Sequence, residues 1–183
     1  MGCWGITAFE SDAGLDAVGF IRRNLPEDGR LELGKVIGAM QKAKCRLPEA
    51  SDGDSHTGPM ALAEIMVKFL DGDLSGLDYD EDWAAADNKF SAITSFTADK
   101  ESVRWLRNYI SDTLQYARED AEFRAQHGEK WCGWRNENLW LDWQEHMSAL
   151  TIRLDTLLAS TESRIELIRP QEQANGPIMG LNQ

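Results

Sequence analysis

Apolar residues recur every three to four positions along most of this chain, which is the spacing of one face of an α-helix. The first such stripe follows Ser11 and Asp12, either of which can cap a helix start. No segment alternates convincingly between apolar and polar residues as a half-buried strand would, although residues 92–96 could form a short extended piece. The pattern therefore predicts an all-α fold. About six helices are expected, over residues 12–25, 33–47, 59–70, 83–93, 99–127 and 136–169.

The domain organisation predicted from the sequence is simple. A chain of 183 residues fits one domain, so residues 1–170 are expected to form a single compact helical domain and residues 171–183 a frayed tail. No apolar run approaches the roughly 20 residues that a membrane span needs. The N-terminus also lacks the basic and apolar regions of a signal peptide. We therefore expect a cytoplasmic protein.

The cysteines favour no disulfide framework. Cys3, Cys45 and Cys132 are isolated in the sequence, and no two of them form a CxxC pair. Sparse cysteines of this kind are usually reduced and packed or partly buried. No motif ties any of the three histidines to a cysteine, so thiol catalysis is not indicated.

The negative charge is concentrated in one segment. The whole chain carries a formal charge of −12, and residues 49–82 hold ten acidic residues against one basic residue. Phosphate groups would be repelled by such a surface, which argues against nucleic acid and anionic membranes as partners. A cationic partner, a metal ion or a simply solvated acidic surface remain open.

The favoured hypothesis is a binding protein without a cofactor or a catalytic site. An acidic surface can occlude a basic cleft on a partner and speed association with it. An immunity protein that neutralises a secreted effector toxin of a competing bacterium would work in this way. The residues expected to contact the partner are six acids and two loop tryptophans that could anchor an interface: Asp52, Asp54, Asp71, Asp73, Asp78, Asp80, Trp131 and Trp134. Two further tryptophans, Trp140 and Trp143, lie three residues apart on one helix and are expected in the core.

A calcium-binding module is one alternative. The segment Asp71–Asp82 places oxygen-bearing residues at loop positions 1, 3, 5 and 12 and Gly76 at position 6, as in an EF-hand. It departs from that template at Asp78, where an apolar residue is usual, and at Asp82, which is shorter than the usual glutamate. The competing interpretation is an acidic helix connection whose last acids cap the next helix.

An enzyme of unknown type is the other alternative. Its site would lie among Glu137, Asp142, Glu145 and His146, with His127 as a further candidate. The spacing of these residues matches no zinc or di-iron motif, and the chain contains none of the common hydrolase or nucleotide-binding motifs.

The N-terminus carries a family resemblance. Met1-Gly2-Cys3-Trp4-Gly5, followed by Phe9-Glu10-Ser11-Asp12 and an amphipathic helix, resembles a bacterial family known as domain of unknown function 4259. The segment 61–66 and the helix around Trp140 and Trp143 are also similar to that family. The resemblance implies a small, mostly helical cytosolic protein and no established activity. We expect Trp4 and Phe9 to cover one end of the helical core, with the glycines allowing a tight turn.

Overall fold

The computed structural model describes residues 2–43, 47–78, 89–129 and 137–168. These residues are mostly helical, as predicted, but they are not all-α. Five α-helices, three 3₁₀ turns and one small three-stranded sheet make up the described structure. In chain order, the elements are η1 (Ala8–Glu10), α1 (Asp12–Arg23), β1 (Arg30–Glu32), α2 (Leu33–Ala43), η2 (Ala50–Asp52), α3 (Gly58–Asp71), η3 (Phe90–Ala92), β2 (Ser95–Asp99), α4 (Lys100–Gln126), α5 (Glu137–Leu158) and β3 (Arg164–Glu166).

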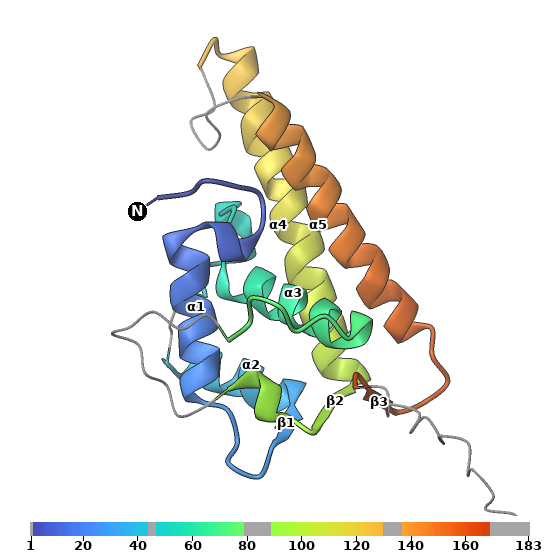
Figure 1. Cartoon of the computed structure of the whole chain (residues 1–183). Helices are drawn as coiled ribbons and strands as arrows, with labels where there is room; N and C mark the ends of the chain where they lie inside the picture. The colour runs from blue at the N-terminus through green and yellow to red at the C-terminus, as the bar shows by residue number, and fades with distance from the viewer. Residues whose placement is uncertain (1, 44–46, 79–88, 130–136, 169–183) are drawn as a thin grey trace, which may run out of the picture.

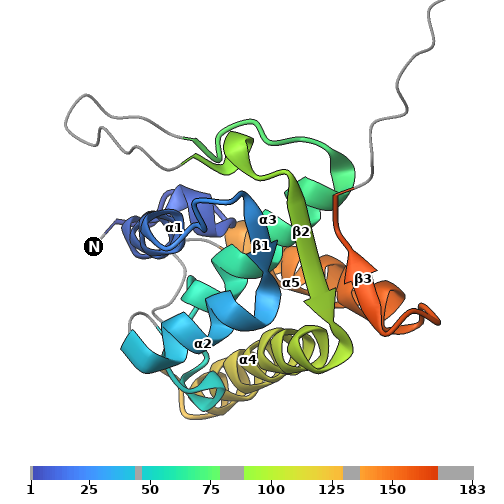
Figure 2. The same ribbon diagram turned by 90° about the horizontal axis from the view of Figure 1, so that it is seen from below.

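Helix α3 forms the centre of the molecule. Figures 1 and 2 show it surrounded by α1, the sheet and the α4–α5 pair. Every residue from Gly58 to Met66 is buried, because η1, α1, α4 and α5 all contact this helix. A helix covered on every side must be apolar around its whole circumference. The one charged residue within this buried stretch, Glu64, therefore needs partners inside the protein.

Helices α4 and α5 form a long antiparallel pair that extends beyond the rest of the molecule (Figure 1). Trp143 is fully buried, as predicted, and its indole nitrogen donates a hydrogen bond to the Ser55 carbonyl at 2.9 Å. Trp140 is only partly buried and stacks on Trp143 with 5.5 Å between the ring centroids. The core of the pair is built from the predicted stripes, including Val103, Leu106, Ile110 and Leu114 on α4 and Met147, Leu150 and Leu154 on α5.

The small sheet corrects the all-α prediction. Strand β2 pairs in parallel with β1 and antiparallel with β3. Each strand buries one or more apolar side chains against the core, among them Leu31, Phe96 and Ile165. Strands β1 and β3 have three residues each, which is too short for an alternating pattern to be recognised in the sequence. The extended piece anticipated at residues 92–96 overlaps β2, which spans Ser95–Asp99.

The predicted helix boundaries are confirmed at two caps and wrong at one end. Ser11 accepts a hydrogen bond from the Gly14 amide, and Asp99 accepts one from the Ser102 amide, so both cap helices as expected. The helix predicted over residues 136–169 ends at Leu158, because the chain then turns to place β3 beside β2. Of the predicted helix 83–93, residues 83–88 lie outside the described residues, and the rest contains only η3. The predicted tail 171–183 also lies outside them, and no described helix combines the length and apolarity needed to cross a bilayer.

The N-terminal segment packs as predicted except for its tryptophan. The Glu10 carboxylate accepts hydrogen bonds from the Ile6 and Thr7 amides, and these bonds hold its pKa below the usual range. A Cβ atom at Gly5 would lie 2.2 Å from that carboxylate, so any side chain there would displace the Glu10 carboxylate from these bonds. Phe9 packs against the core, but Trp4 is 57% exposed. The prediction that Trp4 covers the core is therefore wrong, because the turn is filled by the Glu10 side chain.

Candidate functional site

The acidic residues predicted to contact a partner differ in how they are placed. Asp52 and Asp54 are exposed, and within the described part of the chain neither forms an ion pair with a lysine or arginine. Partial burial and the neighbouring charge of Asp52 raise the pKa of Asp54. Among the described residues, no lysine or arginine therefore compensates the charge of these two carboxylates.

The other acidic residues have partners inside the protein. Asp71 forms an ion pair with Arg153 of α5. Asp73 accepts a hydrogen bond from the Ser75 amide and lies 3.9 Å from the ammonium of Lys68.

Asp78 caps η3 by accepting hydrogen bonds from the Phe90 and Ser91 amides at 2.6 and 2.9 Å. A calcium ion at the Asp71–Asp82 loop would have to displace these contacts and those of Asp71 and Asp73. In the described part of the chain, no three histidine, cysteine or acidic side chains are grouped as a metal site would require. Asp80 lies outside the described residues, as do Trp131 and Trp134, so their positions stay predictions.

A surface that sequence reasoning missed runs along α4. Six residues at alternating spacings of four and three lie on one side of this helix, and we call them the α4 face. Trp105 comes first, and from the next residue on the face alternates aromatic and acidic side chains in the order Tyr109, Asp112, Tyr116, Glu119 and Phe123. Tyr116 and Phe123 are 44% and 59% exposed, so two aromatic rings of this face are open to solvent.

The loop that carries Asp52 and Asp54 packs against helix α4 beside the α4 face. A Cβ atom at Gly53 would lie 3.1 Å from the backbone of Ala117, so the loop approaches the helix closely. The Tyr109 hydroxyl donates a hydrogen bond to the Pro48 carbonyl at 2.8 Å. Burial raises the pKa of Tyr109 to about 12, and the charges of Asp54 and Asp52 add to the effect.

The acids of the loop therefore lie close to Tyr109 of the α4 face. At one end of the α4 face, a cavity of about 390 Å³ lies between Trp105, Tyr109 and the segment 47–50. Asp112 and Glu119 form no ion pair with any described basic residue. The apolar stripe predicted over residues 103–117 corresponds to the side of α4 that is buried in the structure. The α4 face could not be recognised as an apolar stripe in the sequence, because its acidic residues interrupt the apolar pattern.

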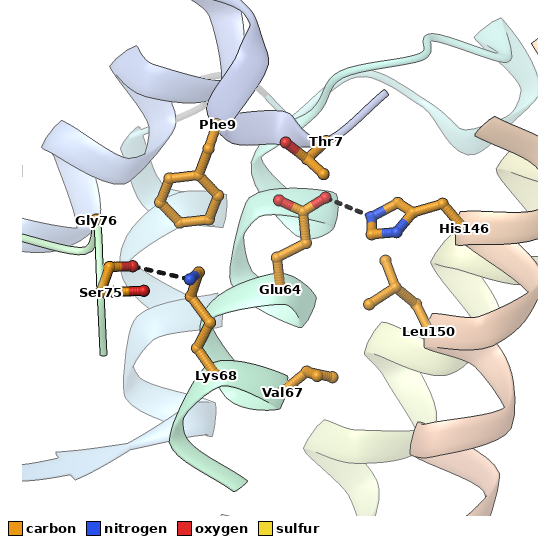
Figure 3. A pocket seen from close by; sticks show the side chains of 9 residues that line it. All are labelled: Thr7, Phe9, Glu64, Val67, Lys68, Ser75, Gly76, His146 and Leu150. Atoms are coloured by element: carbon orange, nitrogen blue, oxygen red, sulfur yellow. Dashed lines mark hydrogen bonds and ion pairs between the residues drawn. The ribbon is translucent and has the colours of Figure 1, made fainter. Parts of the chain in front are cut away.

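A second candidate site is a pocket between η1, α3 and α5 (Figure 3). It has a volume of about 360 Å³ and mostly apolar walls, provided by Phe9, Val67 and Leu150. Glu64 lies at its centre and His146 at one side, while the side chain of Lys68 approaches from the other (Figure 3).

Glu64 holds three parts of the chain together beside this pocket. Its side chain is 6% exposed, and both carboxylate oxygens lie 3.0 Å from the Ala8 amide. Its Oε1 atom also lies 2.6 Å from Nε2 of His146. A buried carboxylate is tolerated when hydrogen-bond donors surround it, and these contacts supply them.

The residues of the predicted enzyme site are not brought together. His146 lines the pocket, but Glu137, Asp142 and Glu145 are exposed on α5. His127 lies at the far end of α4, where its ring packs against Phe123 with 4.2 Å between the ring centroids. Of the residues in that hypothesis, His146 is the one that lines the pocket, and Glu64, which also lines it, was not among the candidates.

Cys3 and His56 are distant in the sequence and lie side by side in the structure. The thiol of Cys3 donates a hydrogen bond to the Gly5 carbonyl and lies 3.6 Å from Nε2 of His56. Cys3 is exposed, which differs from the packed position expected for it, and Cys45 and Cys132 lie outside the described residues. Burial lowers the pKa of His56 and so favours the neutral form of its ring. Nδ1 of this ring shares a hydrogen bond with the Ser55 hydroxyl at 2.8 Å.

Comparisons of this chain with family models, with curated proteins and with solved structures find no match. The resemblance to domain of unknown function 4259 therefore stays a prediction.

Proposed function

We propose that this protein acts by binding a second protein that carries a basic surface, and that the partner docks on the α4 face. In the biological setting that we favour, the protein is an immunity protein and the partner is the toxic domain of a secreted bacterial effector. Cationic clefts are common in toxins that act on nucleic acids or nucleotides, and an acidic surface can block such a cleft.

The observation that carries this proposal is the alternation of exposed aromatic and acidic side chains on α4. Aromatic residues contribute most of the binding energy in many interfaces, and Tyr116 and Phe123 are already exposed. Between them lies Glu119, and Asp112 precedes Tyr116 by one helical turn. An arginine or lysine of a partner could pair with either acid while its side chain lies against a neighbouring ring.

The charges of Asp52 and Asp54 support the same position. The pKa of Asp54 is raised by partial burial and by the neighbouring charge of Asp52, so ionising this carboxyl costs more than ionising an ordinary aspartate. A docked cation would lower that pKa and stabilise the complex. Asp71, Asp73 and Asp78 contribute less in this proposal, because each already has a partner within the chain.

The proposal is tested by charge reversal on the α4 face. The variant with Asp112→Lys and Glu119→Lys should lose protection when it is co-expressed with the toxic domain encoded by a neighbouring gene. The matched control carries Asp142→Lys and Glu145→Lys, the same change in charge on exposed positions of α5. We expect the control to protect cells as well as the wild type does.

Binding of the purified toxic domain gives a second measurement. The affinity of the wild-type protein should fall with increasing salt, because the attraction between unlike surface charges is screened. The α4 variant should bind at least tenfold more weakly at low salt. Equal binding by the α4 variant and the wild type would contradict the docking position. Absence of protection by the wild-type protein would contradict the immunity role.

A further inference from the structure

We propose that the pocket between η1, α3 and α5 binds a small amphipathic carboxylate, with the carboxylate on Lys68 and the apolar body between Phe9, Val67 and Leu150. This inference goes beyond the protein-binding function, because it concerns a different site and a different class of ligand. Neither site needs the other in order to work.

The shape and walls of the pocket fit a small organic ligand. Its volume of about 360 Å³ lies within the range of small-molecule sites, which is roughly 300–1,000 Å³. Leu150 is part of the hydrophobic core, and Phe9 and Val67 pack against that core. An apolar chain placed between these side chains would leave water, and each buried methylene should tighten binding about fourfold.

The charges in the pocket favour an anionic ligand. Glu64 is the one carboxylate in the described lining, and its oxygens already accept hydrogen bonds from the Ala8 amide and face His146. A cationic ligand would therefore have to compete with these contacts. Lys68 is the one lysine or arginine in that lining. Its positive charge is therefore the charge that a bound ligand can pair with, and such a ligand must be an anion.

The ammonium of Lys68 is held in place but not saturated. It donates a hydrogen bond to the Ser75 carbonyl at 2.8 Å and lies 5.8 Å from the centroid of the Phe9 ring. The nearest carboxylate with which it pairs, that of Asp73, is 3.9 Å away and largely exposed. An ammonium has three N–H donors, so Lys68 can bind a ligand carboxylate without losing its bond to Ser75.

His146 offers a second polar contact. Its Nε2 atom is directed at Glu64, and this contact fixes the orientation of the ring (Figure 3). Within the described part of the chain, Nδ1 of His146 has no hydrogen-bond partner. A ligand that carries a hydroxyl or amide group on its apolar body could use this atom, whereas a simple alkyl carboxylate would use Lys68 alone.

The test compares three ligands of equal length: octanoate, octan-1-ol and octylammonium. Calorimetry and the methyl NMR signals of Val67 and Leu150 report binding and its position. We expect octanoate to bind at least tenfold more tightly than the other two compounds and to shift both methyl signals. Equal affinities for the three compounds, or shifts confined to other methyl groups, would overturn the proposal.

Two variants of the pocket sharpen the test. Lys68→Met should weaken octanoate binding about tenfold and leave octan-1-ol unchanged, because it removes one charge-assisted contact. The matched control is Lys42→Met on α2, an exposed lysine outside the pocket lining, and it should bind octanoate as the wild type does. The proposal fails if the two methionine variants bind octanoate equally.

Val67→Phe should block octanoate by filling the pocket. Circular dichroism establishes whether this variant is folded. If it is not folded, the NMR map on the wild-type protein decides the question by itself.

Discussion

The buried contact between Glu64 and its partners should contribute measurably to stability. Replacing Glu64 by glutamine keeps the size of the side chain and one oxygen acceptor for the Ala8 amide, but it removes the negative charge. The bond to His146 at 2.6 Å and the bonds to Ala8 at 3.0 Å then lose their ionic component. Hydrogen bonds to charged groups contribute about 1.5–3 kcal/mol, so the free energy of unfolding should fall by about 2 kcal/mol.

Thermal unfolding checks this value. For a chain of this length, each kcal/mol shifts Tm by roughly 2–4 °C, so Glu64→Gln should lower Tm by about 4–8 °C. The control is Glu145→Gln, which changes an exposed carboxylate on α5 next to His146. Its free energy of unfolding should stay within about 0.5 kcal/mol of the wild-type value.

A double-mutant cycle then tests the pair itself. If Glu64 and His146 interact as the geometry indicates, the variant with Glu64→Gln and His146→Gln should lose about 1 kcal/mol less than the two single changes added together. Additive losses would show that the two side chains do not stabilise one another. A Tm for Glu64→Gln equal to that of the Glu145→Gln control would refute the whole argument.

Three other predictions follow from the backbone and the titrating groups. Gly14→Ala would place a Cβ atom 1.8 Å from the Ala8 carbonyl oxygen and should destabilise the protein by at least about 3 kcal/mol. Gly38→Ala would place its Cβ atom where no other atom lies within 4 Å, and it should stabilise the helix by about 0.5 kcal/mol. Urea unfolding of both variants measures the two changes in free energy. Because burial lowers the pKa of His56, stability should fall as pH drops below about 6.5 toward that lowered pKa, and an NMR titration of the His56 ring that gives an unshifted pKa would contradict this. The Tyr109 hydroxyl should ionise only near pH 12, so absorbance at the tyrosinate band should show one late tyrosine, and stability should fall as pH rises above about 10.

Several local features of the fold could be predicted from single segments. The capping roles of Ser11 and Asp99 were predictable, because a cap acts on an amide three residues away. The burial of Trp143 was predictable as well, since its position repeats with the apolar stripe of its helix. The exposure of Trp4 was not, because it depends on how the Glu10 side chain fills the turn.

The candidate sites depend on contacts between distant segments. Glu64 and His146 are 82 residues apart in the sequence, and each looks ordinary within its own helix. Asp71 is separated by the same distance from Arg153, which is why its charge appeared to be available to a partner. Only the packed structure shows which carboxylates are neutralised and which remain open.

The amino-acid sequence by itself determined that this chain forms long amphipathic helices and that its charge is strongly negative. Both are sums over local properties: an apolar stripe is set by the spacing of neighbours, and net charge does not depend on conformation. The tertiary structure alone decided which faces of those helices meet. That choice placed Glu64 against His146, left the α4 face exposed, and added the three short strands, because each of these features arises from contacts that a helical period does not encode.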